Sequence, residues 1–188
     1  SNGVFFNAGL VNGCEQPSLR PGLYTPNGGH AIVEHWYAFS TRSAVVGRET
    51  ARSIWLARNQ DQAGFRVTDI LDARRPLLID PTAAVSYTDP AWSPDGKYLA
   101  YVKTDALLTR TDIYVQEFQI STVSTVAATP VGPPLLVAEG GAGRRNRHPA
   151  WSPAGDAIAY TSNVGGPSLD IVTVPVDAAA RIVGTLIR

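Results

Sequence analysis

Few side chains in this sequence are able to do chemistry, and their spacing fits no catalytic or metal-binding arrangement. The three histidines are His30, His35 and His148, and the first two stand five residues apart with Glu34 between them. A zinc site on one helix face needs histidines at i and i+4. The sequence also contains no Gly-x-Ser-x-Gly nucleophile elbow and no glycine-rich phosphate loop. We therefore expect no catalytic residue, no metal site and no cofactor.

Protein recognition suits the polar loops better than catalysis does. A glycine-rich loop at 140–148 carries three arginines. Arginine pairs well with carboxylates, and arginine and tyrosine are enriched among the residues that dominate protein interfaces. The alternative interpretation is a solvated loop. The candidate partner contacts are Tyr24, Tyr87, Arg144, Arg145 and Arg147.

The composition is that of a neutral globular protein. The chain has 188 residues, of which 44% are hydrophobic and 17% charged, with 16 basic and 16 acidic side chains. Nucleic-acid binding is not expected, because it needs a basic surface to neutralise phosphates. No run of about 18 apolar residues is present, so the visible chain is not expected to span a membrane. Cys14 is the single cysteine, which excludes an internal disulfide.

One stretch of sequence occurs twice in the same order. The thirteen residues Asp89–Tyr101 and the thirteen residues His148–Tyr160 are identical at eight positions. A second match follows each copy, since an Asp-Ile pair begins 20 residues after Trp92 and 19 residues after Trp151. Matched spacing of this kind indicates a repeated structural unit.

Each copy has the local signals of two strands joined by a tight turn. Pro-Ala-Trp-Ser is extended, Ser-Pro-x-Gly turns the chain, and a run of β-favouring residues follows. Gly96 and Gly155 are expected to have positive φ, or to lie where a Cβ would clash, because both sit in the turn. Asp95 is expected to cap its own turn, and the two tryptophans are expected to lie in the core.

These motifs resemble the TolB-like β-propeller repeat family, whose signature is a Trp-Ser-Pro-Asp-Gly turn, a strand ending in Ala-Tyr or Ala-Phe, and a later Asp-Ile-Tyr-Val strand. The resemblance implies an all-β fold, a β-propeller that is incomplete or open, with three to four antiparallel four-stranded blades. The structural repeat positions that it assigns are Trp92, Pro94, Gly96, Tyr101, Trp151, Pro153, Gly155 and Tyr160.

A degraded third copy precedes the two clear ones. Residues 36–40 resemble the Ala-aromatic strand and residues 53–57 the later strand, and a fourth copy is conceivable within 59–88. Residues 1–29 are rich in Gly, Asn and Pro, which predicts an irregular arm. The expected blades are then approximately 30–80, 81–140 and 141–188. A ring of six blades needs about 240 residues, so we expect a fragment, an open partial propeller covered by a partner or by the arm, or a small closed ring with unusual blades.

Two functions follow from this interpretation. The first is a non-catalytic protein-interaction or structural module. It would be a periplasmic or otherwise exported bacterial accessory subunit that packs on a larger protein assembly, and any association with the membrane would be through a partner. The second is the propeller part of a prolyl-oligopeptidase-like hydrolase or a lyase whose catalytic residues lie outside this chain. The chain starts at Ser1 and has no methionine, which predicts a removed leader or a missing N-terminus.

Overall fold

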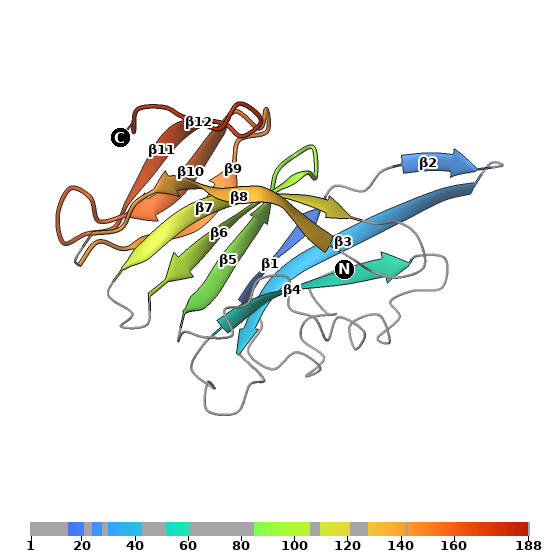
Figure 1. Cartoon of the computed structure of the whole chain (residues 1–188), viewed down its shortest axis with the longest axis horizontal. Helices are drawn as coiled ribbons and strands as arrows, with labels where there is room; N and C mark the ends of the chain where they lie inside the picture. Colours follow the sequence, from blue (N-terminus) through green and yellow to red (C-terminus); the bar gives the residue numbers. More distant parts are fainter. Residues whose placement is uncertain are drawn as a thin grey trace.

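The chain folds into β-strands throughout its described part. The computed structural model describes residues 15–20, 24–27, 30–42, 52–60, 85–105, 110–120, 128–141 and 143–187. Twelve strands lie in these ranges, which contain no helix and hence no helix that could cross a membrane. The strands form three sheets that lie side by side in Figure 1. This confirms the all-β prediction and is compatible with part of a propeller, and the described residues do not close a ring.

The middle sheet is an antiparallel meander of four strands. Its order is β5-β6-β7-β8, so every strand pairs with the next one along the chain. The strand bounds are β5 Ser86–Trp92, β6 Tyr98–Thr104, β7 Thr111–Ile120 and β8 Ala128–Ala138. Short loops suffice for such antiparallel neighbours.

The last sheet repeats this arrangement. Its order is β12-β11-β10-β9, again a meander of sequential neighbours. The strand bounds are β9 Asn146–Trp151, β10 Ala157–Ser162, β11 Asp170–Asp177 and β12 Ile182–Val183. The fourth strand is short, and a single bridge between Thr173 and Ile187 extends it.

The two meanders share one register. Trp92 pairs with Leu99 in the middle sheet, and Trp151 pairs with Ile158 in the last sheet. The first strand of each meander carries a register shift. Asp89 and His148, which are equivalent residues of the repeat, lie at this shift and have φ values of 52° and 54°. A shift of this kind is a β-bulge, which bends the strand. The repeat in the sequence is therefore also a repeat in the backbone.

The first sheet is built around one long strand. Strand β3 (His30–Arg42) pairs with β1 (Glu15–Arg20), β2 (Tyr24–Asn27) and β4 (Arg52–Gln60), all antiparallel. The predicted strand pair at 36–40 and 53–57 is confirmed, since it lies within β3 and β4. The predicted fourth copy at 59–88 lies mostly outside the described residues.

The predicted irregular arm needs a correction. Two of its segments are strands, β1 and β2, and β1 has the place in the first sheet that β5 and β9 have in theirs. Ser18 pairs with Ala38 as Ala91 pairs with Ala100, and in each first strand a register shift precedes this pair. The sequence Pro-Ser-Leu at 17–19 thus corresponds to Pro-Ala-Trp. Proline is compatible with the first strand because an edge or bulge position needs no N–H donor.

Two apolar clusters join the three sheets. We call the side of a sheet that packs on the next sheet along the chain its far face, and the opposite side its near face. The far face of the middle sheet packs on the near face of the last sheet, and the side chains involved are Ala100, Val102, Ile113, Val115, Ile158, Tyr160, Val172, Val174 and Val176. The far face of the first sheet packs on the near face of the middle sheet through Ala38, Ile54, Trp92, Leu99, Tyr101 and Phe118. Alternating residues of each strand thus face opposite neighbours.

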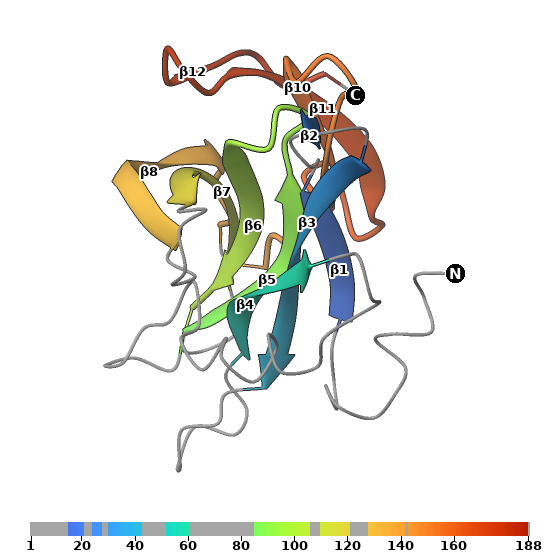
Figure 2. The ribbon, with the colours of Figure 1, turned by 90° about the vertical axis from the view of Figure 1, so that its right-hand side faces the viewer.

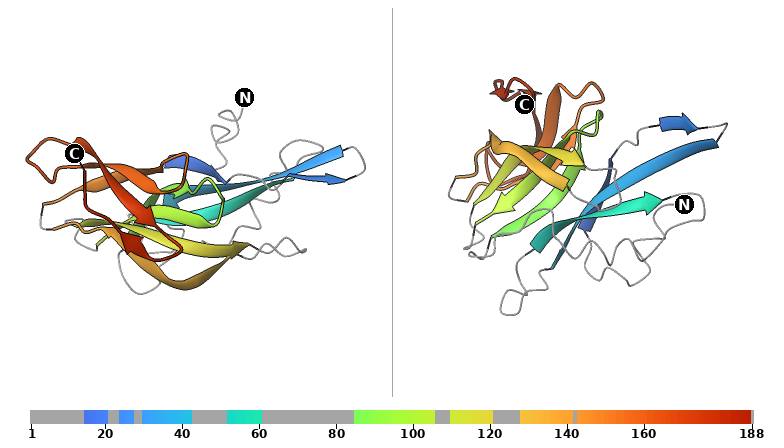
Figure 3. Two further views of the ribbon diagram at one scale, coloured as in Figure 1. Left: turned by 90° about the horizontal axis from the view of Figure 1, so that it is seen from above. Right: turned by 45° about the vertical axis from the view of Figure 1, so that its right-hand side comes forward.

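Views from other directions agree with this order. In Figure 2, strands β1 and β3 of the first sheet lie against β5 of the middle sheet. Figure 3 shows the first and last sheets on opposite sides of the middle sheet. The far face of the last sheet and the near face of the first sheet are therefore the two ends of the stack.

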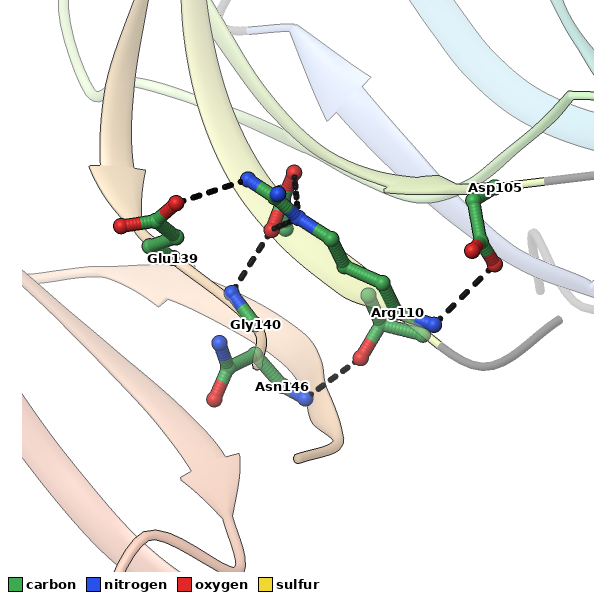
Figure 4. Close-up of polar contacts among 7 residues, drawn as sticks. Asp105, Arg110, Glu139, Gly140 and Asn146 are labelled. Atoms are coloured by element: carbon green, nitrogen blue, oxygen red, sulfur yellow. Dashed lines mark hydrogen bonds and ion pairs between the residues drawn. The ribbon is translucent and has the colours of Figure 1, made fainter. Parts of the chain in front are cut away.

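Polar contacts fix the connection between the middle and last sheets (Figure 4). Asp112 accepts a 2.6 Å hydrogen bond from the backbone N–H of Gly140 and is paired with the guanidinium of Arg110. Arg110 also reaches Glu139 at 3.0 Å. The backbone N–H of Asn146 donates to the Thr111 hydroxyl at 2.7 Å. The start of β7 thereby holds both ends of the loop that leads into β9.

This junction predicts a requirement for glycine at position 140. A Cβ there would lie 2.5 Å from the carbonyl oxygen of Thr111, whereas a Cβ at the neighbouring Gly141 would meet nothing within 4 Å. Gly140→Ala should lower the free energy of unfolding by about 1–3 kcal/mol, because backbone must shift to admit the methyl group. Chemical denaturation measures this. Gly141→Ala is the matched control, and equal stabilities of the two variants would contradict the described packing.

Candidate functional site: a groove between two sheets

A groove opens between the middle and last sheets at the end where their repeat turns lie. It has a volume of about 710 Å³. Three turns border it, which follow β5, β9 and β11 and reach the upper side of the view in Figure 1. The residues that the argument below uses are Asp95, Tyr98, Asp156, Asp177, Ala179 and Ile182.

The first turn is held by a serine hydroxyl. Ser93 Oγ donates to Asp95 and accepts a hydrogen bond from the backbone N–H of Tyr98 at 2.9 Å. The Asp95 carboxylate also accepts from the N–H of Lys97, so Asp95 caps its own turn as predicted. Gly96 has a φ of 70°, a conformation that favours glycine. Its predicted positive φ is confirmed.

The second turn keeps this design with the carboxylate moved. The sequence has Ala154 where the first turn has Asp95, and Asp156 two residues further on. Ser152 Oγ donates to Asp156 at 2.6 Å and accepts from the N–H of Ala157. Gly155 has a φ of 75°, as predicted. The loss of one aspartate from the repeat is therefore compensated by another on the same turn.

The groove combines apolar walls with an acidic rim. Proline, alanine and isoleucine side chains line much of it, and Asp95, Asp156 and Asp177 are exposed at its edge. Partial burial raises the pKa of the Tyr98 hydroxyl, and the charges of Glu117, Asp95 and Asp177 raise it further. Arg181 lies nearby, and its guanidinium donates to the carbonyls of Pro133 and Pro134. Such a site favours a ligand with an apolar stem and a positive charge.

The predicted arginine contacts lie elsewhere. Arg144 and Arg145 are in the loop before β9 and Arg147 is in β9, and all three are exposed. Their loop is tied down by its backbone, since the Arg145 N–H donates to Asn163 at 2.7 Å. These three side chains are exposed at the surface. They lie where β9 begins, which is the end of the sheets opposite the groove.

Of the two predicted tyrosine contacts, Tyr87 has a described side chain. Tyr87 is half-buried, and its ring packs edge-on against Tyr101 with centroids 5.9 Å apart. Tyr101 also stacks on Tyr114, and burial raises the pKa of its hydroxyl. Tyr24 lies in β2, where the structure describes the backbone only. Tyr87 therefore belongs to the packing between the first and middle sheets.

The tryptophans and tyrosines of the repeat pack within and between the sheets. Trp92 is buried and packs edge-on against Phe118. Trp151 is half-buried, and its indole N–H donates to the carbonyl of Ala91 at 3.1 Å, which links the two sheets. Tyr160 is buried like Tyr101, whereas the turn prolines at 94 and 153 are exposed. Among the described residues no group of three His, Cys, Asp or Glu side chains is placed to hold a metal ion.

Sequence reasoning missed the groove itself. Asp177 ends β11 and Ile182 begins β12, and the sequence carries no repeat signal at these two positions. One signal in the sequence is Asp156, which comes two residues after Ala154, the position where the first turn has its aspartate.

The comparison with known proteins finds a partial similarity. The chain is 36% identical over 110 residues to the Tol-Pal system protein TolB of Hahella chejuensis (strain KCTC 2396). The aligned part is 53% of this chain and 23% of TolB, so the chain spans less than a quarter of that protein. No protein-family model matches the chain.

The similarity to TolB supports the TolB-like relationship that the repeats predict. The assignment of the Trp-Ser-Pro-Asp-Gly signature to that family rests on the sequence alone. TolB is by its name a protein of the Tol-Pal system.

The moved carboxylate predicts a rescue. Asp156→Ala should lower the free energy of unfolding by about 1 kcal/mol, because the Ser152 hydroxyl loses its charged acceptor. The double change Ala154→Asp with Asp156→Ala should restore most of that loss, since it recreates the arrangement around Asp95. Thermal unfolding of the three proteins measures this. A double variant less stable than Asp156→Ala would show that the two turns are not interchangeable.

Proposed function

We propose that the chain is a non-catalytic protein-interaction module that binds an extended segment of a partner in the groove between the middle and last sheets. The observation that carries the proposal is the groove, with its apolar walls and three exposed carboxylates, in a chain similar to a protein of the Tol-Pal system. Extended peptides bind well where pockets accept alternate side chains beside a sheet or its loops. The partner segment would carry lysine or arginine next to apolar residues.

The assembly that we propose is of the Tol-Pal type, with the chain as an exported, periplasmic accessory subunit. The similarity to TolB supports this setting. The exposed arginines at 144, 145 and 147 form a proposed second contact, because guanidinium groups free of the groove can pair with carboxylates of a large partner. The alternative, a propeller fragment of a hydrolase or lyase, finds no specific support in the described side chains.

Labelled peptides of matched length and different charge test the groove. We expect basic, apolar peptides to bind more tightly than neutral or acidic ones in fluorescence anisotropy. Asp177→Asn should weaken binding of the basic peptides by about tenfold, the effect of one lost charge pair. The amide keeps an oxygen that can accept the Ala180 N–H, so the local turn is retained. Ala179→Trp should block binding, since Ala179 is exposed on the groove wall.

Strand β11 offers the matched control. Asp170 is an exposed aspartate at the other end of that strand, away from the groove. Asp170→Asn makes the same change of charge and should leave binding unchanged. Equal effects of the two substitutions, or no preference for basic peptides, would contradict the groove as the binding site.

A further inference from the structure

A second, smaller cavity lies between the middle and last sheets, beside the loop that carries Arg144. It has a volume of about 180 Å³, which leaves room for a small ligand, and it shares only Gly184 with the lining of the groove. Valine and leucine side chains form much of its wall. The polar side chains that line it include Asn146, Tyr160 and Arg144. The cavity is therefore a site distinct from the groove.

The repeat explains why a cavity is present at this place. Asn146 pairs with Ser162 in the last sheet. The equivalent pair in the middle sheet is Tyr87 with Lys103. The middle sheet thus has two long side chains where the last sheet has two short ones, and the Tyr87 ring packs edge-on against a neighbouring tyrosine. Because asparagine is shorter, it leaves space beside Tyr160 that a ring would fill.

The side-chain amide of Asn146 has an unused donor at this cavity. Asn146 is 1% exposed, and its Nδ2 has no hydrogen-bond partner among the described residues. Ser162 Oγ accepts the N–H of Val164 and donates to Asn146 Oδ1 at 2.7 Å, which holds the amide oxygen on the side of Ser162. The NH₂ group is left for another acceptor. Buried polar side chains almost always have a partner, so this group is expected to bind one.

Two further groups at the cavity suit the same kind of ligand. Tyr160 is buried, and burial raises the pKa of its hydroxyl, which keeps the proton in place for donation. The positive charge of the exposed Arg144 acts on this hydroxyl and opposes the shift in pKa. Glu139 also lines the cavity, but its carboxylate is already paired with Arg110 at 3.0 Å. The cavity thus offers two buried donors and one cation to a single ligand.

We infer that this cavity binds a carboxylate of a protein partner, with Asn146 and Tyr160 donating hydrogen bonds and Arg144 supplying the positive charge. An ionised carboxylate only accepts hydrogen bonds, takes several of them, and pairs favourably with arginine. The apolar wall suits a short aliphatic stem behind the charge. The inference rests on the arginine contact proposed above, and it names the group that Arg144 would bind.

Titration of the 188-residue chain with propionate tests the site. Propionate should shift the side-chain amide signals of Asn146 in NMR spectra and saturate in the millimolar range, as expected for a ligand of so few atoms. Propionamide has nearly the same size without the charge, and it should bind at least about tenfold more weakly. Equal binding of the two compounds, or no saturable shift with propionate, would overturn the inference.

Two conservative variants have matched controls in the chain. Tyr160→Phe and Arg144→Gln should each weaken propionate binding by about tenfold, the effect of one lost hydrogen bond to a charged group. The controls are Tyr101→Phe, at the equivalent buried position of the middle sheet, and Arg145→Gln, at an exposed position of the same loop. Neither control side chain is among the described residues that line the cavity, so both controls should leave binding unchanged. Circular dichroism verifies that all four variants fold, and equal losses in variants and controls would contradict the site.

Two peptides distinguish the sources of the carboxylate. One ends in valine with a free C-terminus, and the other is amidated and carries an internal glutamate. Displacement of propionate by the first alone indicates a partner's C-terminus, whereas displacement by the second indicates that an acidic side chain suffices. Displacement by neither would overturn the cavity as a partner site. The basic peptides that test the groove should bind Tyr160→Phe and Arg144→Gln normally, so failure of this inference and failure of the proposed function are separate results.

Discussion

Packing of the far face of one sheet on the near face of the next is the interaction on which the structure depends. Each interface buries small and branched side chains of one sheet against apolar side chains of the next, and Ala100 and Val102 share one cluster with Tyr160 and Val172. A fully buried valine or isoleucine contributes about 1.5–3 kcal/mol. A single four-stranded meander buries little by itself, so its stability depends on its neighbours. The register of every strand follows, because a shift by one residue would turn these side chains to the wrong face.

The polar contacts between sheets refine this packing. Thr111 and the indole of Trp151 each bind a backbone group of the adjoining sheet, and Asp112 binds the N–H of Gly140 in the loop between the two sheets. These bonds set the distance and rotation at which the apolar faces meet. The groove is a consequence of that geometry, because the turns of two successive sheets are held apart at one end while their strands are in contact. A partner that binds there would contact two sheets at once.

Much of the fold was predictable from the sequence, and the reasons are physical. The two copies of Pro-Ala-Trp-Ser-Pro-x-Gly combine turn residues with β-favouring strands, and both local signals agree with the packing. The first strand was not found, because Pro17 and its neighbours lie among glycine and asparagine residues and Leu19 replaces the tryptophan. The pairing that makes β1 a strand is with β3, some twenty residues away. The groove depends on how two sheets are placed relative to each other, and no local sequence pattern predicts that placement.

A double-mutant cycle across the interface between the middle and last sheets tests the central claim most directly. Val102→Ala and Val172→Ala each truncate a side chain that is 1% exposed in the same apolar cluster, from opposite sheets. Equilibrium unfolding of the two single variants and the double variant gives the coupling energy. Packing of the two faces predicts a coupling of at least about 0.5 kcal/mol and one cooperative transition in each protein. Losses that add to within about 0.3 kcal/mol, or separate transitions for the two sheets, would contradict it.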